Sequence, residues 1–523
     1  MFDQQVMVGQ VRANLSQLTE IDQAASAVTF ADGRRISSTV RGLDSVTATS
    51  GGRTGRLDLS KVVRIGIAAP SIINSNVNYK IVLRSGDREA AILEGALYVS
   101  AGTTKVTELG PKTAIRFPAV IEDVAAGGGG RFLFLKLNRL HKLAVFDVER
   151  QAVVKYLSID SDNYVFGAGM ESLLVVLPDR NLIQRYSLKT FNLELSEPGL
   201  EEMSANPPAV GYRTFGPAVL QCGRNAVLLG LDTLKPVPYR EQNASRLANP
   251  GTQYRASSES FVFGSWYDAL TPSYIGSLVL EPNIGKHYEQ RESGGYVIPI
   301  PDGSLLLTGN GIYTTDGQST DAEKFGKLAC LPAYNEAFFL TVEDSEGKGR
   351  VSIYAASDRR FLLKLPRFED MTLPLPVDKP QPHGPQRQWP SKGLTFEKLW
   401  HFFPSFSLMV TIPDSRDMLV LRKINLAAAL ERDQKDYVFV SSIPPATFNK
   451  RVPLSYQVET ECRRGPVQLH LDESPHEMTM SPNGRLFWKV PKLFKDGETL
   501  VTISVKDAVG TTVLHTFKLT QVP

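Results

Sequence analysis

The residues best suited to chemistry lie close together near the C-terminus: His470, Asp472, Glu473, His476 and Glu477. Imidazole nitrogens and carboxylate oxygens are common ligands of divalent metals. Residues two apart in a strand share a face, so His470 and Asp472 would lie together, and His476 would join them if the chain turned back. The alternative is the solvated edge of a β-sandwich, where polar side chains alternate outward. We favour this alternative and predict no metal site.

Sequence motifs for known reaction types are missing from the chain. It has no Gly-x-x-x-x-Gly-Lys loop for phosphates, no Gly-x-Ser-x-Gly nucleophile turn and no His-Glu-x-x-His pair for zinc. The glycine run Gly127–Gly130 precedes an apolar β-rich segment rather than a helix, so it lacks the helix dipole that makes glycine loops bind phosphate. We interpret the run as a turn at the start of a structural repeat.

The remaining histidines are scattered along the chain. None has a carboxylate partner that the sequence can identify, although a closed ring of repeats could bring distant residues together at its axis. We therefore predict no catalytic residue and no cofactor. These histidines are His141, His287, His383, His401 and His515.

Six arginines give the first part of the chain a local basic bias. In a small barrel such a bias can indicate RNA binding. No aromatic residues are interleaved with these charges to stack on bases, so an exposed strand face explains them better. Over the whole chain 58 basic residues balance 55 acidic ones, and we predict no nucleic-acid partner. The arginines are Arg34, Arg35, Arg41, Arg53, Arg56 and Arg64.

Length, cysteines and hydrophobic runs bound the type of protein. A chain of 523 residues is long enough for about two to four domains. Cys222, Cys330 and Cys462 are far apart and odd in number, which favours buried free thiols over a disulfide framework. No apolar run approaches the roughly 18 residues that cross a bilayer. The first ten residues lack the features of a secretory signal. A cytoplasmic location is therefore slightly favoured if Met1 is the native start.

The strongest signal in the sequence is a near-repeat with a period of forty residues. Gly130-Arg131-Phe132-Leu133-Phe134 aligns with Met170-Glu171-Ser172-Leu173-Leu174, and Phe146-Asp147 aligns with Tyr186-Ser187. Short apolar strands that recur at this period between turn residues are typical of β-propeller blades. A single blade cannot bury both of its faces, so the blades are stable only as a closed ring.

The propeller is predicted to occupy residues 117–443 with seven blades, six or eight being alternatives. These units resemble the diverged WD-repeat-like propellers of bacteria. They lack the signature His and the terminal Trp-Asp pair, whose equivalent positions hold Phe146-Asp147 and Tyr186-Ser187, so no known partner of that family is carried over. The predicted blades are 119–157, 158–200, 201–248, 249–290, 291–325, 326–370 and 371–443.

A small β module is predicted to precede the propeller at residues 1–116. Asp32-Gly33, Gly51-Gly52 and Ser85-Gly86-Asp87 separate β-rich runs and predict hairpins. The rhythm of strand, turn and strand resembles Sm-like or SH3-like small barrels. Before the first hairpin, Val11, Leu15, Leu18 and Ile21 have helical spacing, which predicts a short amphipathic helix within residues 5–26.

Two departures from the repeat are predicted inside the last blade. Residues 374–393 form an insertion rich in Pro and Gln, which favours extended and mobile conformations and loops out of the ring. Just beyond it, Leu426 and Leu430 lie in an alanine-rich stretch suited to one short helix.

The last segment, residues 444–523, is predicted to be a β-sandwich of about seven short strands, with Trp488 in its core. Pro444-Pro445-Ala446, Ser481-Pro482-Asn483-Gly484 and Val505-Lys506-Asp507 resemble the cadherin-like, immunoglobulin-like modules of large bacterial surface and scaffold proteins. The paired acidic motifs that bind calcium in many cadherins are missing, so no calcium is implied.

These features predict an all-β protein made of three β modules with no recognisable reaction motif. We expect a non-enzymatic scaffold that binds protein partners through propeller loops or the 374–393 insertion, because binding residues concentrate on such loops. Two alternatives remain: the regulatory or sensor portion of a larger kinase or protease, and an enzyme that acts on a small molecule or glycan in the propeller channel. The oligomeric state does not follow from the sequence.

Overall fold

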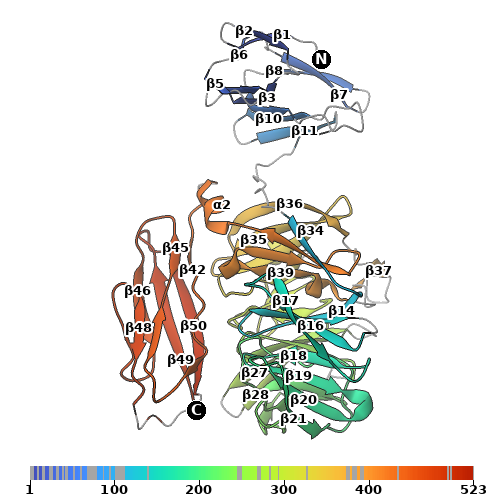
Figure 1. Ribbon diagram of the computed structural model, residues 1–523, viewed down its shortest axis with the longest axis vertical. Coiled ribbons are helices and arrows are strands. Elements are labelled where there is room, and N and C mark those ends of the chain that lie inside the picture. The colour runs from blue at the N-terminus through green and yellow to red at the C-terminus, as the bar shows by residue number, and fades with distance from the viewer. Residues whose placement is uncertain are drawn as a thin grey trace. The chain divides into compact units, whose positions relative to one another are not determined.

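The computed structural model divides the chain into two compact units, Met1–Lys105 and Val106–Pro523 (Figure 1). In the first unit the structure describes the backbone of the strands between Gln5 and Val99. In the second it describes residues 112–521, with the backbone alone for residues 322–323 and for strands 377–379 and 386–388. The gaps are 138–139, 244–249, 268–272, 282–283, 293, 326–327, 373–376, 380–385, 389–393, 433–434, 492–493 and 495–496.

The first unit is built from β-strands that pair mainly as antiparallel hairpins. The three predicted turns each separate two paired strands: β4 from β5, β7 from β8, and β10 from β11. Its sheets have the strand orders β12-β11-β10-β9-β3-β4-β5, β2-β1-β6 and β7-β8. The strands are β1 (Gln5–Val8), β2 (Val11–Asn14), β3 (Leu18–Asp22), β4 (Ala27–Phe30), β5 (Arg35–Ser37), β6 (Val40–Arg41), β7 (Ser45–Ser50), β8 (Arg53–Asp58), β9 (Val62–Ile67), β10 (Tyr79–Ser85), β11 (Arg88–Leu93) and β12 (Ala96–Val99).

The helix predicted within residues 5–26 is wrong. Three strands, β1, β2 and β3, occupy this stretch, and Val8 of β1 pairs with Val11 of β2. Four apolar residues at helical spacing were too few to outweigh the turn-forming Gly9 and the β-branched valines around it.

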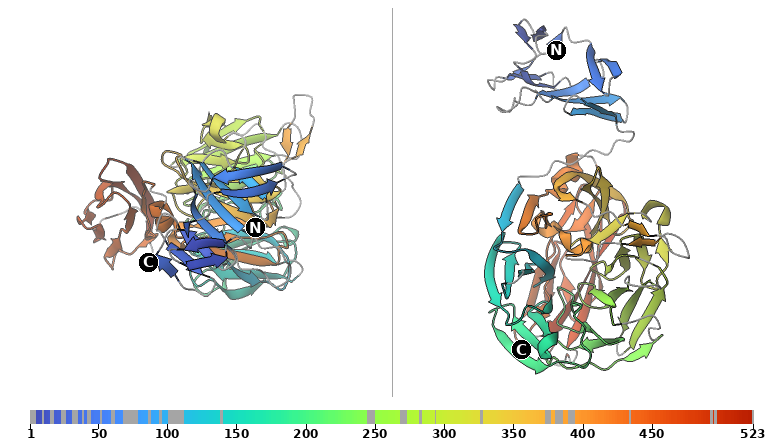
Figure 2. Two further views of the ribbon diagram at one scale, coloured as in Figure 1. Left: turned by 90° about the horizontal axis from the view of Figure 1, so that it is seen from above. Right: turned by 90° about the vertical axis from the view of Figure 1, so that its right-hand side faces the viewer.

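Between Lys112 and Lys423 the described chain forms seven successive sheets, each built mainly from adjacent antiparallel strands, besides a separate two-stranded pair in the 374–393 insertion. The right-hand view of Figure 2 shows these sheets arranged around a common centre. The strands are β13 (Lys112–Arg116), β14 (Ile121–Gly127), β15 (Phe132–Leu137), β16 (Lys142–Asp147), β17 (Ala152–Ser158), β18 (Val165–Ala168), β19 (Ser172–Leu177), β20 (Leu182–Ser187), β21 (Leu193–Pro198), β22 (Ala218–Cys222), β23 (Asn225–Leu229), β24 (Arg240–Gln242), β25 (Gln253–Ala256), β26 (Val262–Tyr267), β27 (Tyr274–Glu281), β28 (Ile284–Gln290), β29 (Val297–Pro299), β30 (Leu305–Thr308), β31 (Gly311–Thr314), β32 (Ser319–Thr320), β33 (Ala329–Pro332), β34 (Phe338–Ser345), β35 (Lys348–Ala355), β36 (Phe361–Thr372), β39 (Trp400–Phe403), β40 (Leu408–Thr411) and β41 (Met418–Lys423).

The ring is closed by the first strand of this series. β13 pairs antiparallel with β41, Lys112 lying opposite Arg422, and completes the sheet β13-β41-β40-β39. Asp370 on the neighbouring sheet fixes this junction, because its carboxylate forms an ion pair with Lys112 at 2.8 Å and accepts a hydrogen bond from Arg422 at 2.5 Å. Residues 112–116, which the sequence analysis assigned to the N-terminal module, therefore belong to the propeller.

The forty-residue repeat follows directly from the strands. β15 and β19 begin at Phe132 and Ser172, and β16 and β20 end at Asp147 and Ser187. The side chain of Asp147 is buried. It accepts hydrogen bonds from Arg131 Nη2 at 2.9 Å and from the backbone N–H of Arg150, and these bonds fix the turn after β16. At the equivalent position, the Ser187 hydroxyl accepts from the backbone N–H of Lys189.

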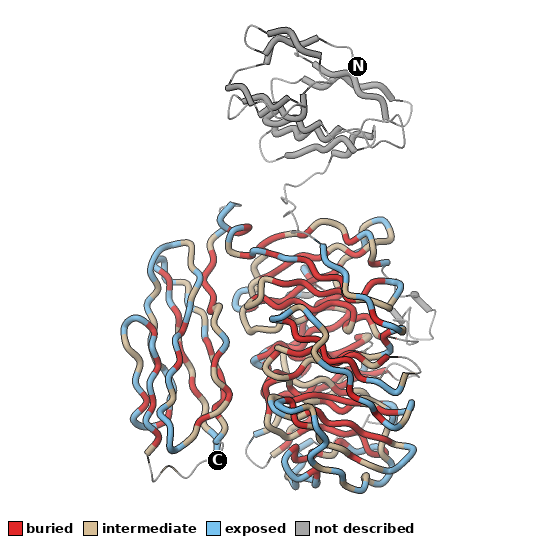
Figure 3. The backbone as a smooth tube through the Cα atoms, viewed as in Figure 1, coloured by how far each residue is buried: buried red, intermediate tan, exposed pale blue. Residues whose placement is uncertain are grey.

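Burial explains why these sequences form stacked sheets. The central strands are apolar on both faces, as in β15 with Phe132–Leu135 and Leu137 buried, because each sheet is covered by its two neighbours (Figure 3). One continuous core cluster runs from Phe117 to Phe439 and includes residues from sheets far apart in the sequence. Closing the ring removes these apolar surfaces from water.

The sheet β22–β23 differs from the others. It contains two full strands, which isolated bridges extend on both sides: Ala209 pairs with Val219, and Leu229 pairs with Pro236. The prediction of an all-β propeller is confirmed by the ring of sheets and its closure. The number of blades stays a prediction.

The innermost segments of the ring run in the same direction. Each enters from one end of the central channel and leaves at the other, as β14 does from Glu122 to the Gly128–Gly130 turn. The channel therefore has two distinct ends, and side chains early and late in these segments line different ones.

The insertion in the last blade contains two short strands, β37 (Val377–Lys379) and β38 (Gln386–Gln388), that pair antiparallel. Its predicted mobility lies outside the described residues. Two 3-10 turns, Phe396–Leu399 and Pro404–Phe406, flank β39. The short helix predicted near Leu426 is present as α2 (Leu426–Arg432), and α1 (Ala322–Phe325) is a single turn.

The C-terminal segment is a β-sandwich with its own core. Its described sheets have the strand orders β43-β50-β49-β46 and β44-β48-β47, and β42 pairs with β45. Trp488 is fully buried in this core, and its indole N–H donates to the carbonyl of His476 at 3.1 Å. The strands are β42 (Val438–Val440), β43 (Thr447–Phe448), β44 (Leu454–Gln457), β45 (Thr460–Cys462), β46 (Gln468–Glu473), β47 (Thr479–Met480), β48 (Arg485–Trp488), β49 (Glu498–Lys506) and β50 (Thr512–Gln521). β42 begins before residue 444, so Val438–Val440, predicted to lie in the last blade, belong to the sandwich.

Candidate functional site in the propeller channel

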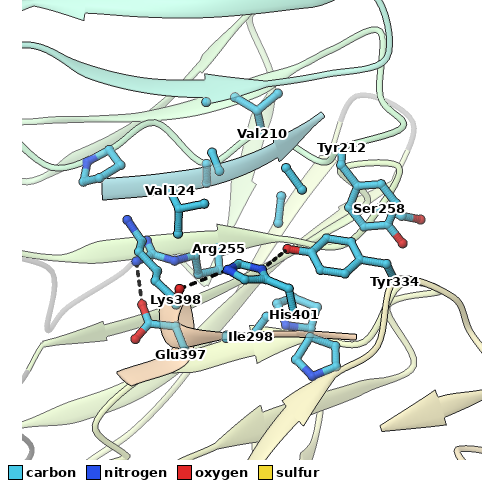
Figure 4. Close-up of a pocket in the computed structure, with 18 of the residues that line it drawn as sticks. Val124, Val210, Tyr212, Arg255, Ser258, Ile298, Tyr334, Glu397, Lys398 and His401 are labelled. Atoms are coloured by element: carbon cyan, nitrogen blue, oxygen red, sulfur yellow. Dashed lines mark hydrogen bonds and ion pairs between the residues drawn. The ribbon is translucent and has the colours of Figure 1, made fainter. Parts of the chain in front are cut away.

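A cavity of about 160 Å³ lies in the propeller channel and is lined by the innermost segments of all seven sheets. Its wall is largely aliphatic and proline-rich, and Val124, Val210 and Ile298 line it (Figure 4). Prolines are tolerated there because these segments are the free inner edges of their sheets. The cavity could hold one apolar or aromatic group, since cavities near 150 Å³ accept a benzene ring.

Two ion pairs lie at one side of this cavity. Arg255 Nη2 donates to Glu397 Oε1 at 2.8 Å, and the guanidinium also lies 4.9 Å from the ring of Trp266. Lys398 pairs with the carboxylate of Asp123. Burial lowers the pKa of Lys398, although the charge of Asp123 opposes this shift. The pairs join segments 142 and 275 residues apart: Arg255–Glu397 connects two sheets that are distant in the ring, and Lys398–Asp123 connects the last sheet to the first.

His401 is held as a neutral ring with a defined tautomer. Its Nε2 lies 3.0 Å from the backbone oxygen of Lys398, which can only accept, so Nε2 carries the proton. Its Nδ1 therefore accepts from the hydroxyl of Tyr334 at 2.9 Å (Figure 4). Burial lowers the pKa of His401 to about 4. With both nitrogens hydrogen-bonded, this histidine is a structural element of the wall rather than an available base.

A second cavity, of about 260 Å³, forms the mouth of the channel. It shares Pro207, Arg255 and Lys398 with the first cavity and is lined by more polar residues, including Glu122 and Lys136. Lys136 lies 4.6 Å from the ring of Tyr164 and 3.7 Å from the carboxylate of Glu122. Leu394, which follows the 374–393 insertion, also lines this mouth, so the insertion rejoins the ring here.

Two tyrosines close the other end of the cavity. Tyr212 and Tyr334 contact each other edge to face with ring centroids 5.2 Å apart, and Tyr334 stacks on Phe403 at 4.3 Å. Both tyrosines line the channel cavity on one side and a smaller cavity of about 30 Å³ on the other. The smaller cavity has room for little more than a water molecule.

The C-terminal sandwich covers this tyrosine end of the channel. Ser442, Ile443, Pro444 and His515 line the small cavity together with propeller residues. Arg213 Nη2 donates to the carbonyl oxygen of Pro444 at 3.4 Å. Among the described residues, the channel is thus uncovered at the mouth and covered by the sandwich at the opposite end.

A buried polar network holds the sandwich in this position. Glu336 on the propeller lies 2.6 Å from His515 Nδ1, and His515 Nε2 lies 3.2 Å from the hydroxyl of Tyr456. Burial alone would raise the pKa of Glu336, but the hydrogen bond and charge of His515 lower it overall. Nearby, Arg213 pairs with Glu259 at 3.0 Å, and burial still raises the pKa of Glu259.

The residues singled out as possible metal ligands do not form a shared site. His470 and Asp472 do share a face of β46, with Nδ1 and Oδ1 2.6 Å apart, and Asp472 also accepts from Ser504. His476 lies 3.7 Å from Glu477 on a separate turn, and the side chains of His470 and His476 are 78% and 89% exposed. Among the described residues, no cluster of three or more His, Cys, Asp or Glu has a metal-binding arrangement.

The other residues named from the sequence lie in varied surroundings. His287 is buried in β28, His141 lies 3.5 Å from Asp162 at the surface, and His383 lies outside the described residues. The side chains of the six N-terminal arginines are also outside them. Gly128, Gly129 and Gly130 have positive φ and form the turn between β14 and β15. Cys222 and Cys330 are buried free thiols, and Cys462 is a half-buried one. No described helix is long and apolar enough to cross a membrane.

Sequence reasoning missed the channel residues Arg255, Glu397, Lys398, Tyr334 and His401. The only available signal was positional, since each lies within, just before or just after the innermost strand of its sheet. Nothing in the sequence shows that the Arg255 and Glu397 segments meet, because ring closure alone brings them together.

The comparisons with known proteins give low similarity. No protein-family model and no curated protein matches this sequence. Among solved structures, the β-propeller domain of Cps50 (Swd1) from Myceliophteria thermophila is 11% identical with a TM-score of 0.38, and the match covers 60% of this chain and all of that one. Hydrazine synthase of Kuenenia stuttgartiensis is 10% identical with a TM-score of 0.37, and the match covers 62% of this chain and 99% of that one.

Proposed function

We propose that this chain is a non-enzymatic protein-interaction scaffold whose partner binds at the channel mouth. One observation carries the proposal: the charged groups of the channel are engaged with one another, and the space left between them is apolar. Arg255 pairs with Glu397, Lys398 pairs with Asp123, and His401 uses both nitrogens. A preformed apolar cavity whose charged neighbours are already paired with one another suits the anchoring of a partner's side chain.

The location of the insertion also supports binding of a partner at the channel mouth. Residues 374–393 rejoin the ring at Leu394, beside the mouth, so a partner seated there would be within reach of the insertion. The opposite end of the channel is covered by the sandwich, which leaves the mouth as the accessible end.

The test uses the full chain purified from its native cells with crosslinking, followed by mass spectrometry. Ile298→Phe fills the cavity without altering a charge, and deletion of 374–393 removes the insertion. The control is Val237→Phe, which places the same aromatic on the outer surface, where Val237 is 41% exposed. We expect stoichiometric partners to be retained by wild type and Val237→Phe and lost from Ile298→Phe. Retention of every partner by both the cavity variant and the deletion would contradict the proposal.

An enzyme acting on a small molecule in the channel is a second candidate, favoured by one observation. Tyr212 lines the cavity, its hydroxyl has no hydrogen-bond partner among the described residues, and burial raises its pKa. A bound small molecule could supply that partner. Metabolite screening by native mass spectrometry, with Tyr212→Phe as the variant, separates the two candidates. A released product in wild type that Tyr212→Phe fails to form would favour the enzyme.

A further inference from the structure

One edge of the C-terminal sandwich has main-chain groups that point away from its sheet. β50 pairs with β49 in continuous register, from Lys506 opposite Thr512 to Glu498 opposite Thr520. The backbone N–H of Asp507 donates to the carbonyl of Thr511, and that of Gln521 donates to Gly497. Inward and outward hydrogen bonding alternates along an antiparallel strand, so Thr512 and Leu514 direct their N–H and C=O groups outward.

The C-terminal end of this edge of β50, near Thr520, is already paired with another strand. The N–H of Thr520 donates to the carbonyl of Ala446, and β43 pairs there in parallel with β50. At the N-terminal end of β50, the described residues provide no main-chain partner for the outward N–H and C=O groups of Thr512 and Leu514. The edge is therefore competent for strand pairing and is occupied at one end only.

A cleft of about 470 Å³ lies along this open end, between the sandwich and the propeller. Thr511–Leu514 form one wall, and the other wall includes Ala355, Ala356 and Leu362 of the propeller. The side chain of Leu514 is 58% exposed beside it. The apolar, small-residue wall leaves room for an apolar side chain projecting from an added strand.

Charged residues of both signs line the cleft: Asp302 and Glu336, of which Glu336 is paired with His515, and two arginines that an acidic side chain could reach. Arg359 and Arg360 line it and pair with Asp321 and Asp358, the second pair at 3.4 Å. All four of these side chains are between about a third and a half exposed. Exposed ion pairs contribute little stability, so an incoming carboxylate could replace either aspartate at small cost.

We propose that the cleft binds an extended segment of a protein partner, which adds a strand to the Thr512–Leu514 edge of β50. The segment carries an apolar side chain toward Ala355 and Ala356 and an acidic side chain toward Arg359 and Arg360. Main-chain hydrogen bonds supply affinity, and the alternate side chains supply selectivity. This site is separate from the channel mouth, so this proposal can be tested independently of the scaffold function proposed there.

The direct test is hydrogen exchange of the full chain, resolved to single amides, with and without a probe peptide. The probe alternates valine and threonine around one glutamate. We expect the exchange of the Thr512 and Leu514 amides to slow at least about tenfold on binding. The amide of Val513, which faces β49, serves as the internal control and should not change.

Two changes to the pairing groups make the test specific. Leu514→Pro removes an outward N–H and should weaken binding of the probe peptide about tenfold, which corresponds to about 1.4 kcal/mol of binding free energy. Leu514→Ala keeps the N–H and should bind more tightly than the proline variant. If the proline variant does not fold, a probe with alternate N-methylated amides on the pairing edge replaces it and should fail to bind wild type.

Three outcomes would overturn the proposal. The first is equal binding of the methylated and unmethylated probes, and the second is protection at the channel mouth instead of β50. The third is protection of Leu514 without the probe, accompanied by a dimer in sedimentation, which would assign the edge to a second copy of the chain. Ile298→Phe should leave probe binding unchanged, so that failure of the mouth proposal is distinguished from failure of this one.

Discussion

His515 Nδ1 of the sandwich lies 2.6 Å from Glu336 Oε1 of the propeller, and these two residues are 179 positions apart in the chain. The side chain of His515 is 2% exposed, and that of Glu336 is 21% exposed. A charge-assisted hydrogen bond in such surroundings fixes orientation because either partner alone would be left buried without compensation. The pair therefore couples the covered end of the channel to the sandwich that covers it.

Breaking this pair should loosen the sandwich from the propeller. Glu336→Ala leaves the His515 Nδ1–H buried without an acceptor, and we expect a loss of about 2 kcal/mol in the free energy of unfolding. The control is Glu149→Ala, which breaks the Arg131–Glu149 pair, whose side chains are 41% and 61% exposed. That change should cost under about 1 kcal/mol. Equal losses in urea unfolding would show that the Glu336 pair has no special role.

Stability should depend on pH through His401. Its pKa of about 4 lies below the ordinary value of 6.5, so the unfolded chain binds a proton at a higher pH than the folded one. The stabilisation is complete above pH 6.5 and is lost as the pH falls toward 4, by about 3 kcal/mol in total. Urea midpoints measured across this window should fall less steeply for His401→Gln than for wild type. The exposed-site control His476→Gln should follow wild type.

Ring closure should depend on Asp370. Asp370→Asn removes the charge that compensates Arg422, whose side chain is 6% exposed, and we expect a loss of about 3 kcal/mol. Hydrogen exchange in β13 should accelerate at the same time. The control, Asp417→Asn, breaks a pair with Arg116, which is 71% exposed, and should change little. Unaltered exchange in β13 of the Asp370 variant would mean that strand pairing alone closes the ring.

Gly211 marks a close approach between neighbouring inner segments. A Cβ atom there would lie 2.3 Å from the carbonyl oxygen of Ser257 and 2.4 Å from that of Ser258, and neither backbone atom can move freely. Gly211→Ala should therefore destabilise the ring by about 2 kcal/mol or more. Gly497→Ala, with nothing within 4 Å of the added atom, is the matched control. A thermal unfolding midpoint that is equal for both variants would contradict this account.

Local patterns in the sequence predicted those parts of the fold that are built from strands adjacent in the chain. The forty-residue repeat predicted the succession of sheets because each sheet consists mainly of adjacent strands. The position of β13 could not be predicted in this way, since its partner β41 is about 300 residues away. The same limit applies to the candidate site. His401 and Tyr334 come from different sheets, and the sequence contains no sign that they meet.

The pairing of β13 with β41 also determines how the ring responds to tension. Chain segments leave the ring from Lys112 and from Lys423, and Lys112 lies opposite Arg422 in antiparallel register. A pull applied through both flanking segments would therefore separate the two strands one hydrogen bond at a time from this end, instead of shearing the whole ladder at once. The protein's mechanical weak point is the seam where its propeller begins and ends, and the Lys112–Asp370–Arg422 contact lies at the end that would open first.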